Sequence, residues 1–99
     1  MKIPPGPEGD SMAENTKFEE TISQVKQQIS ILLNDTSVPR NVKTALDEAK
    51  KSLESSESYA VRASTATYKI DEVSNDINLP PYARTVIWSM LSMLESIKD

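Results

Sequence analysis

The sequence contains no cysteine and no histidine among its 99 residues. The missing cysteines exclude disulfides, thiolate metal sites and cysteine nucleophiles. The missing histidines remove the commonest general base and the commonest metal ligand of proteins. Zinc sites, Ser-His-Asp triads and the Glu-x-x-His pairs of di-iron helical bundles are therefore excluded by the residue inventory alone.

Long apolar runs and net positive charge are also missing. No segment approaches the roughly 20 apolar residues of a membrane span, and "MKIPPGPEGDS" at the start lacks the apolar stretch of a signal peptide. The net charge is −4, with 11 basic residues spread along the chain, which disfavours binding to a phosphate backbone. We therefore expect a cytoplasmic protein with no membrane association and no dominant nucleic-acid partner.

Glycine occurs only in the first nine residues, which also hold three of the six prolines. A stretch of this composition cannot bury enough apolar surface to order itself, so residues 1–13 are predicted to form a disordered tail. Met12 is a candidate for the natural start. Residues 14–99 are predicted to form a single domain, because a chain of this length holds one core.

From Glu14 onward, apolar residues recur at steps of three and four, the spacing of one face of an α-helix. Four such stripes are separated at Asn34, at "ESSES" (54–58) and at Asn75. No segment alternates with the period of two that a strand requires, so the sequence predicts an all-α fold. The predicted stripes are Phe18, Ile22, Val25, Ile29 and Leu32/Leu33; Val42, Ala45/Leu46, Ala49 and Leu53; Tyr59, Ala63, Ala66, Ile70 and Val73; and Ala83, Val86/Ile87, Met90/Leu91, Leu94 and Ile97.

Two stretches, "LLNDTSVPRNVKTAL" (32–46) and "VSNDINLPPYARTVI" (73–87), repeat one pattern at an offset of 75 − 34 = 41 residues. In each, the Asn is expected to end a helix in the left-handed conformation that Asn tolerates, and the Pro suits the first turn of the next helix. The identities are Asn34/Asn75, Asp35/Asp76, Pro39/Pro80, Thr44/Thr85, Leu53/Leu94 and Glu54/Glu95.

The repeat predicts one helical hairpin made twice, closed into a four-helix up-and-down bundle. The two Asn-Asp corners would lie at one end of the bundle and residues 54–58 at the other. A period near 41 and the stretch "AVRASTA" (60–66) are HEAT-like in local sequence. "AVRASTA" is out of register with the repeat, however, and two hairpins are fewer than the three or so repeats that a solenoid needs.

The stretches "NDTSVPRNVKTALDEAK", "YAVRASTAT" and "SNDINLPPYARTVIWSMLSMLE" resemble a small archaeal family of uncharacterised proteins that carries only a placeholder designation. The resemblance covers roughly residues 16 to 97, and it is specific because the two corners and "RTVIW" occur in order. It implies a short helical-bundle protein and no activity. The proline-bearing start lies outside it.

Asp35 and Asp76 are candidate paired carboxylates, which in proteins bind a divalent cation or share a proton. The structural interpretation, which we favour, is that each accepts hydrogen bonds from N–H groups at the start of the next helix or pairs with Lys43 or Arg84. No metal ligand is assigned on this evidence.

The three arginines, Arg40, Arg62 and Arg84, each lie near a predicted helix start, where the helix dipole disfavours a cation. We expect the corner aspartates to hold them. The alternative is that Arg40, Lys43 and Arg84 form a local basic cluster for an RNA partner.

Trp88 lies far from the predicted buried stripe of its helix, and its repeat counterpart is Asp47. The preceding helix has a similar second face with Val61 and Tyr68. Exposed tryptophan is enriched at protein interfaces, so Trp88, Tyr68, Val61 and Arg84 are candidate interface residues. Either these faces contact another chain, or Trp88 covers the edge of the core and the third helix is buried on two sides.

The sequence therefore predicts a non-enzymatic helical interaction module without a cofactor, which self-associates or binds a protein partner through its third and fourth helices. A carboxylate-based metal site at the corners and an RNA-associated role remain the alternatives.

Overall fold

The computed structural model describes residues 7–97, with side chains from residue 15 onward. This part of the chain forms four helices and no strand: α1 (Pro7–Leu33), α2 (Arg40–Leu53), α3 (Tyr59–Val73) and α4 (Pro81–Glu95). The predicted all-α fold is therefore confirmed.

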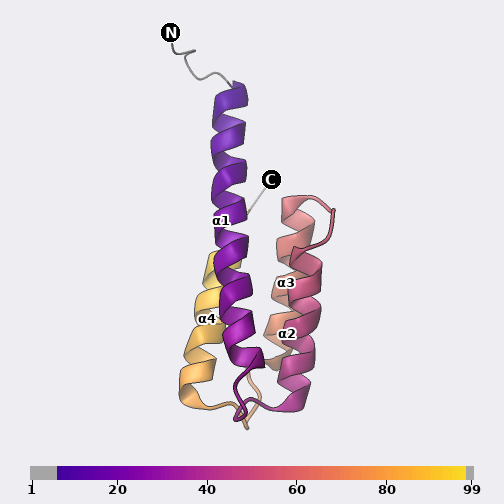
Figure 1. The fold of residues 1–99 in the computed structure, drawn as a ribbon, viewed down its shortest axis with the longest axis vertical. Coiled ribbons are helices and arrows are strands. Elements are labelled where there is room, and N and C mark those ends of the chain that lie inside the picture. Colours follow the sequence, from indigo (N-terminus) through magenta and orange to yellow (C-terminus); the bar gives the residue numbers. More distant parts are fainter. Residues whose placement is uncertain (1–6, 98–99) are drawn as a thin grey trace.

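The helices run up and down in chain order (Figure 1). α1 packs against α2 and α4, and α3 packs against the same two helices, which closes a four-helix bundle. The α1–α2 and α3–α4 connections lie together at the lower end in the view of Figure 1, and the α2–α3 connection lies at the upper end. The predicted placement of the corners is confirmed, whereas the likeness to HEAT repeats stays a prediction from local sequence.

α1 begins at Pro7, seven residues before the helix start expected at Glu14. Its first turns extend beyond the ends of the other helices (Figure 1). Proline suits the first position of a helix because its missing N–H has no intrahelical partner to lose there. The disordered tail expected over residues 1–13 stays a prediction; the described helix begins within it, at Pro7, and residues 1–6 lie outside the described part.

The core consists of the four predicted stripes. Ile29, Leu46, Ile70 and Ile87, one from each helix, are all fully buried. Two further core residues, Val38 and Leu79, lie in the corners, 41 residues apart, and were missed because loops carry no helical periodicity. Phe18, Tyr59 and Val73 lie at the core edge and are only partly buried.

The helix ends at the corners differ from expectation in one respect. No described residue has a positive φ angle, so Asn34 does not end α1 in the left-handed conformation. Its side-chain Nδ2 instead donates to the Ser30 carbonyl at 3.1 Å, which satisfies one of the last helical acceptors. Pro39 and Pro80 lie one residue before the first turns predicted for them, as the N-cap residues of α2 and α4, with nearly equal ψ angles of 153° and 150°.

Contacts at the opposite end tie α1 to α3. The Tyr59 hydroxyl donates to Glu19 Oε2 at 2.5 Å, and the Tyr59 ring packs on Phe18 with 5.4 Å between ring centroids. The Glu19 carboxylate raises the pKa of Tyr59, because ionising the phenol beside it is unfavourable. The Arg62 guanidinium lies over the Tyr59 ring, 4.4 Å from the ring centroid.

Two isoleucines of α1 provide a matched test of this core. Ile29→Ala is expected to lower the free energy of unfolding by about 2–5 kcal/mol, because it removes a fully buried side chain. Ile31→Ala is expected to change it by less than about 0.5 kcal/mol, since Ile31 is 66% exposed. Urea unfolding followed by far-UV circular dichroism measures both, and equal losses would contradict the assigned helix face.

Candidate functional site

The two corners have the same backbone geometry. The N–H groups of Val38 and Leu79 donate to the carbonyls of Asp35 and Asp76, each at 3.2 Å. The N–H groups of the two aspartates in turn donate to the last turn of the preceding helix, each at 3.1 Å. The sequence repeat is therefore a structural repeat.

Each aspartate side chain stabilises its own corner. Asp35 Oδ1 accepts from the Ser37 N–H at 2.9 Å, and Asp76 Oδ1 accepts from the Asn78 N–H at 2.8 Å. These are Asx turns, in which the carboxylate bonds the backbone two residues on. The sequence placed these bonds at the start of the next helix, but they form earlier, within the connection, and neither α2 nor α4 has a side-chain cap.

The second carboxylate oxygen of each aspartate binds the opposite hairpin. The Tyr82 hydroxyl of α4 donates to Asp35 Oδ2, and Asn41 Nδ2 of α2 donates to Asp76 Oδ2 at 2.8 Å. Since 41 + 41 = 82, the two donors occupy equivalent repeat positions. We call this pair of bonds the reciprocal clasp. The sequence comparison did not predict the clasp, because the equivalent positions hold different residues, Asn41 and Tyr82. The property that they share is a side-chain hydrogen-bond donor.

Hydrogen bonds favour the ionised form of both aspartates: those from Ser37 at Asp35, and those from Asn41 of the clasp and from Asn78 at Asp76. Hydrogen bonds from Ser37, with a smaller contribution from the Lys43 charge, lower the pKa of Asp35 below its ordinary 3.8. The hydrogen bonds from Asn41 and Asn78, followed by the Arg84 charge, lower the pKa of Asp76 in the same direction. Donors to a carboxylate favour its charged form, which is the physical cause in both cases.

The arginines are not held as expected. Arg84 Nη2 donates to the backbone carbonyl of Asp76 at 3.1 Å rather than to its carboxylate. Arg62 lies at the other end of the bundle, where Nη1 donates to the Leu53 carbonyl at 3.3 Å. Arg40 is exposed and Lys43 is half-buried. The structure therefore brings Arg84, but not Arg62, to the corner end.

Trp88 is 55% exposed, Tyr68 is 63% exposed and Val61 is 46% exposed. Helical periodicity places Tyr68 and Val61 on the side of α3 opposite its buried stripe, and Trp88 on a polar side of α4. We call this surface the outer face; its residues are Val61, Ser64, Thr65 and Tyr68 of α3 and Thr85, Trp88 and Ser92 of α4. The repeat counterpart Asp47 instead pairs with Lys51 at 3.2 Å on α2.

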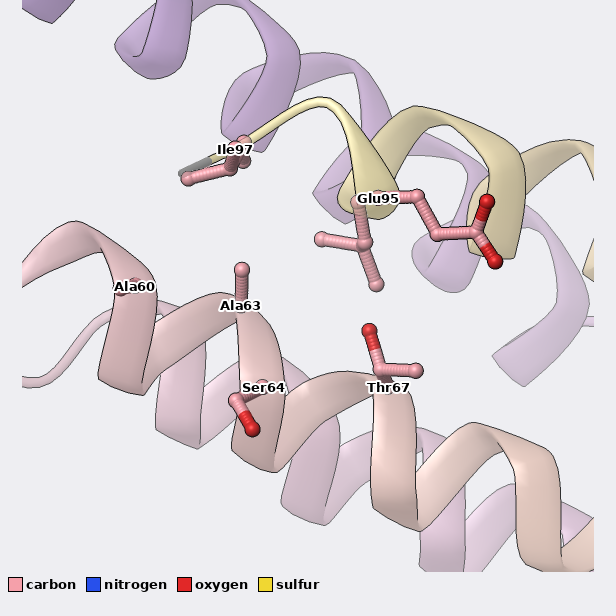
Figure 2. Close-up of a pocket in the computed structure, with 7 residues that line it drawn as sticks. Ala60, Ala63, Ser64, Thr67, Glu95 and Ile97 are labelled. Carbon is pink, nitrogen blue, oxygen red and sulfur yellow. The ribbon is translucent and has the colours of Figure 1, made fainter. Parts of the chain in front are cut away.

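A hollow of about 300 Å³ opens between α3 and the end of α4 (Figure 2). Ala63 and Thr67 project from α3 toward it, while the Ser64 hydroxyl points away. The hollow forms because the side chains of α3 that face the end of α4, such as Ala63 and Thr67, are small. Its lining consists of Ala60, Ala63, Ser64, Thr67, Leu94, Glu95 and Ile97. Nothing in the apolar periodicity signalled it.

Two searches of the described residues bear on other kinds of site. Among residues 15–97, no three carboxylates gather in a group able to hold a metal ion. In the same part of the chain, no helix has both the length and the hydropathy needed to cross a bilayer.

The family model described as "Uncharacterised protein family (UPF0147)" matches residues 8–97. The chain is 42% identical to UPF0147 protein MJ1419 of Methanocaldococcus jannaschii over 91% of this chain and 97% of that protein. It is 46% identical to a UPF0147 protein of Metallosphaera sedula over 78% and 91% of the two chains. The crystal structure of the unknown-function protein MMP1188 superposes with a TM-score of 0.76 at 30% identity, covering 99% of this chain and 100% of that one.

The lowered pKa values of Asp35 and Asp76 predict a loss of stability in acid. A group whose pKa is lower in the folded state stabilises the fold above its unfolded pKa, here 3.8. That contribution disappears as the pH falls through the folded value. The melting temperature of wild type should therefore fall more steeply between about pH 5 and pH 2 than that of an Asp35→Asn, Asp76→Asn double variant.

Asp47→Asn removes a carboxylate from α2 without touching either corner and serves as the control. It should keep the steep acid loss of the wild type. If the melting temperatures of wild type and the corner double variant fell in parallel with pH, the corner aspartates would not contribute to the acid loss of stability.

Proposed function

The chain belongs to the UPF0147 family, whose description assigns no activity, and we propose that it is a non-catalytic, cytoplasmic protein-interaction module. Its contact surface is the outer face of α3 and α4. The observation that carries this proposal is the 55% exposure of Trp88. Tryptophan is the residue most enriched among the anchors that dominate binding energy at protein interfaces.

The exposure of Trp88 has no reason within the fold. Ala83, Ile87, Met90 and Leu94 already supply the buried stripe of α4. A large apolar side chain left in water disfavours solubility unless a partner covers it. Tyr68 and Val61 add apolar area on the neighbouring helix, so burial of the outer face would provide the driving force for association.

The polar surroundings fit the same role. Thr85, Ser92, Ser64 and Thr65 carry no charge, so a partner that covers these four residues desolvates no ion. Arg84 stands at its edge, half-buried and tied to the corner. An apolar centre with charge confined to the rim is the usual composition of an interface.

The alternatives receive less support from the contacts. The oxygens of Asp35 and Asp76 already accept hydrogen bonds from the protein, so a cation would compete with the reciprocal clasp. For an RNA role, Arg84 donates inward to the Asp76 carbonyl and does not join Arg40 as a freely presented charge.

Trp88→Ala is expected to abolish association, whether the partner is a second copy or another protein. Sedimentation velocity over a concentration series measures self-association, and affinity purification from the native organism captures other partners. Ile31→Ala is the matched control, because Ile31 is an apolar residue of similar exposure on α1. A monomeric wild type that captures no protein in a Trp88-dependent way would refute the proposal.

Calorimetric titration with magnesium, manganese and calcium tests the metal alternative. We expect no binding heat, because the corner carboxylates are occupied by protein donors. Binding that disappears in the Asp35→Asn, Asp76→Asn double variant would establish the corner as a metal site instead.

A further inference from the structure

Trp88 projects from the outer face, and a recess lies beside the outer face. The recess is the hollow of about 300 Å³ between α3 and the end of α4. A dry enclosed cavity of about 150 Å³ accepts benzene; this hollow is larger and open to the surface, so an aromatic ring can enter it from outside. Ala60, Ala63, Leu94 and Ile97 give this hollow apolar walls, and Thr67 and Glu95 add polar groups.

The projection and the recess lie on one side of α4. Trp88 and Glu95, which lines the hollow, are seven residues apart, which is close to two helical turns. The two side chains therefore point the same way from α4, about 10 Å apart along its axis at 1.5 Å per residue. The same side of α4 thus carries Trp88 and, further along the helix axis, the hollow that could receive a tryptophan side chain.

From this arrangement we infer that the partner of the outer face is a second copy of this chain, in a two-fold dimer where each Trp88 fills the hollow of the other. This inference rests on the proposed function. A projection and a recess on the same surface are exchanged by a two-fold axis, which closes the assembly at two chains. A recess filled by a buried aromatic anchor is the usual centre of binding energy.

The antiparallel pairing that this symmetry imposes places Glu95, which lines the hollow, opposite Trp88 of the other copy. The indole N–H of Trp88 makes no hydrogen bond within residues 15–97, and the exposed Glu95 carboxylate at the partner's hollow supplies an acceptor.

The two-fold axis passes near Ser92, which follows Trp88 by four residues and precedes Glu95 by three. Because the chain has no cysteine, Ser92→Cys introduces a single thiol whose only disulfide joins two copies. We expect its dimer to form at least about tenfold faster than that of Ser89→Cys, since a disulfide needs Cα atoms about 5–6 Å apart. Ser89 is equally exposed on α4 but faces away from the axis.

Blocking the hollow provides the second measurement. Thr67→Phe fills the space from α3, because the Thr67 side chain points into it. We expect it to weaken the dimer at least about 30-fold in sedimentation, as does Trp88→Ala. Thr44→Phe, the same change at an exposed position of α2, leaves the dimer intact. Circular dichroism confirms that the variants fold.

The outcomes separate this inference from the proposed function. Equal cross-linking of Ser92→Cys and Ser89→Cys, or a dimer unaffected by Thr67→Phe, overturns the two-fold arrangement. A monomeric chain that captures a different protein through Trp88 overturns the dimer and leaves the interaction module standing. A monomer with no Trp88-dependent partner overturns both.

Discussion

The burial of one apolar stripe from each of four helices is the constraint on which the rest of the structure depends. α2, α3 and α4 are 14 or 15 residues long, a length at which an isolated helix is only marginally stable in water. They are helical because Leu46, Ile70 and Ile87 leave water together with Ile29 of α1. With no cysteine in the chain, non-covalent packing has to supply the stability.

Apolar burial alone does not determine how two similar hairpins pair. The reciprocal clasp adds that information, because Asn41 reaches Asp76 and Tyr82 reaches Asp35 only when the two corners lie at the same end. A register shift of one turn would separate both donors from their carboxylates while leaving many apolar contacts possible. The clasp therefore contributes to specificity through geometry, although both of its bonds are exposed.

The sequence predicted the helices, their buried faces and the common end of the two corners, because all three follow from local periodicity and the 41-residue offset. It did not predict the clasp, since Asn41 and Tyr82 differ in every respect except that both donate a hydrogen bond. The prediction that a corner aspartate holds Arg62 was wrong, because a position near a helix start does not reveal at which end of the bundle the residue lies. The hollow could not be predicted from the sequence either. The apolar stripes of α3 and α4 are regular, and the volume left between the two helices depends on how far apart they pack.

The positions at which the two repeated hairpins differ show which residues the fold requires and which it does not. Asn41 and Tyr82 differ, yet both make the same kind of bond to a corner aspartate, so the fold accounts for that difference. Asp47 and Trp88 also differ, but the charged member pairs with Lys51 on the surface while Trp88 remains 55% exposed. An internally repeated fold that is complete with aspartate at this position has no structural use for tryptophan there. The proposed function accounts for this difference, because a partner on the outer face would bury Trp88.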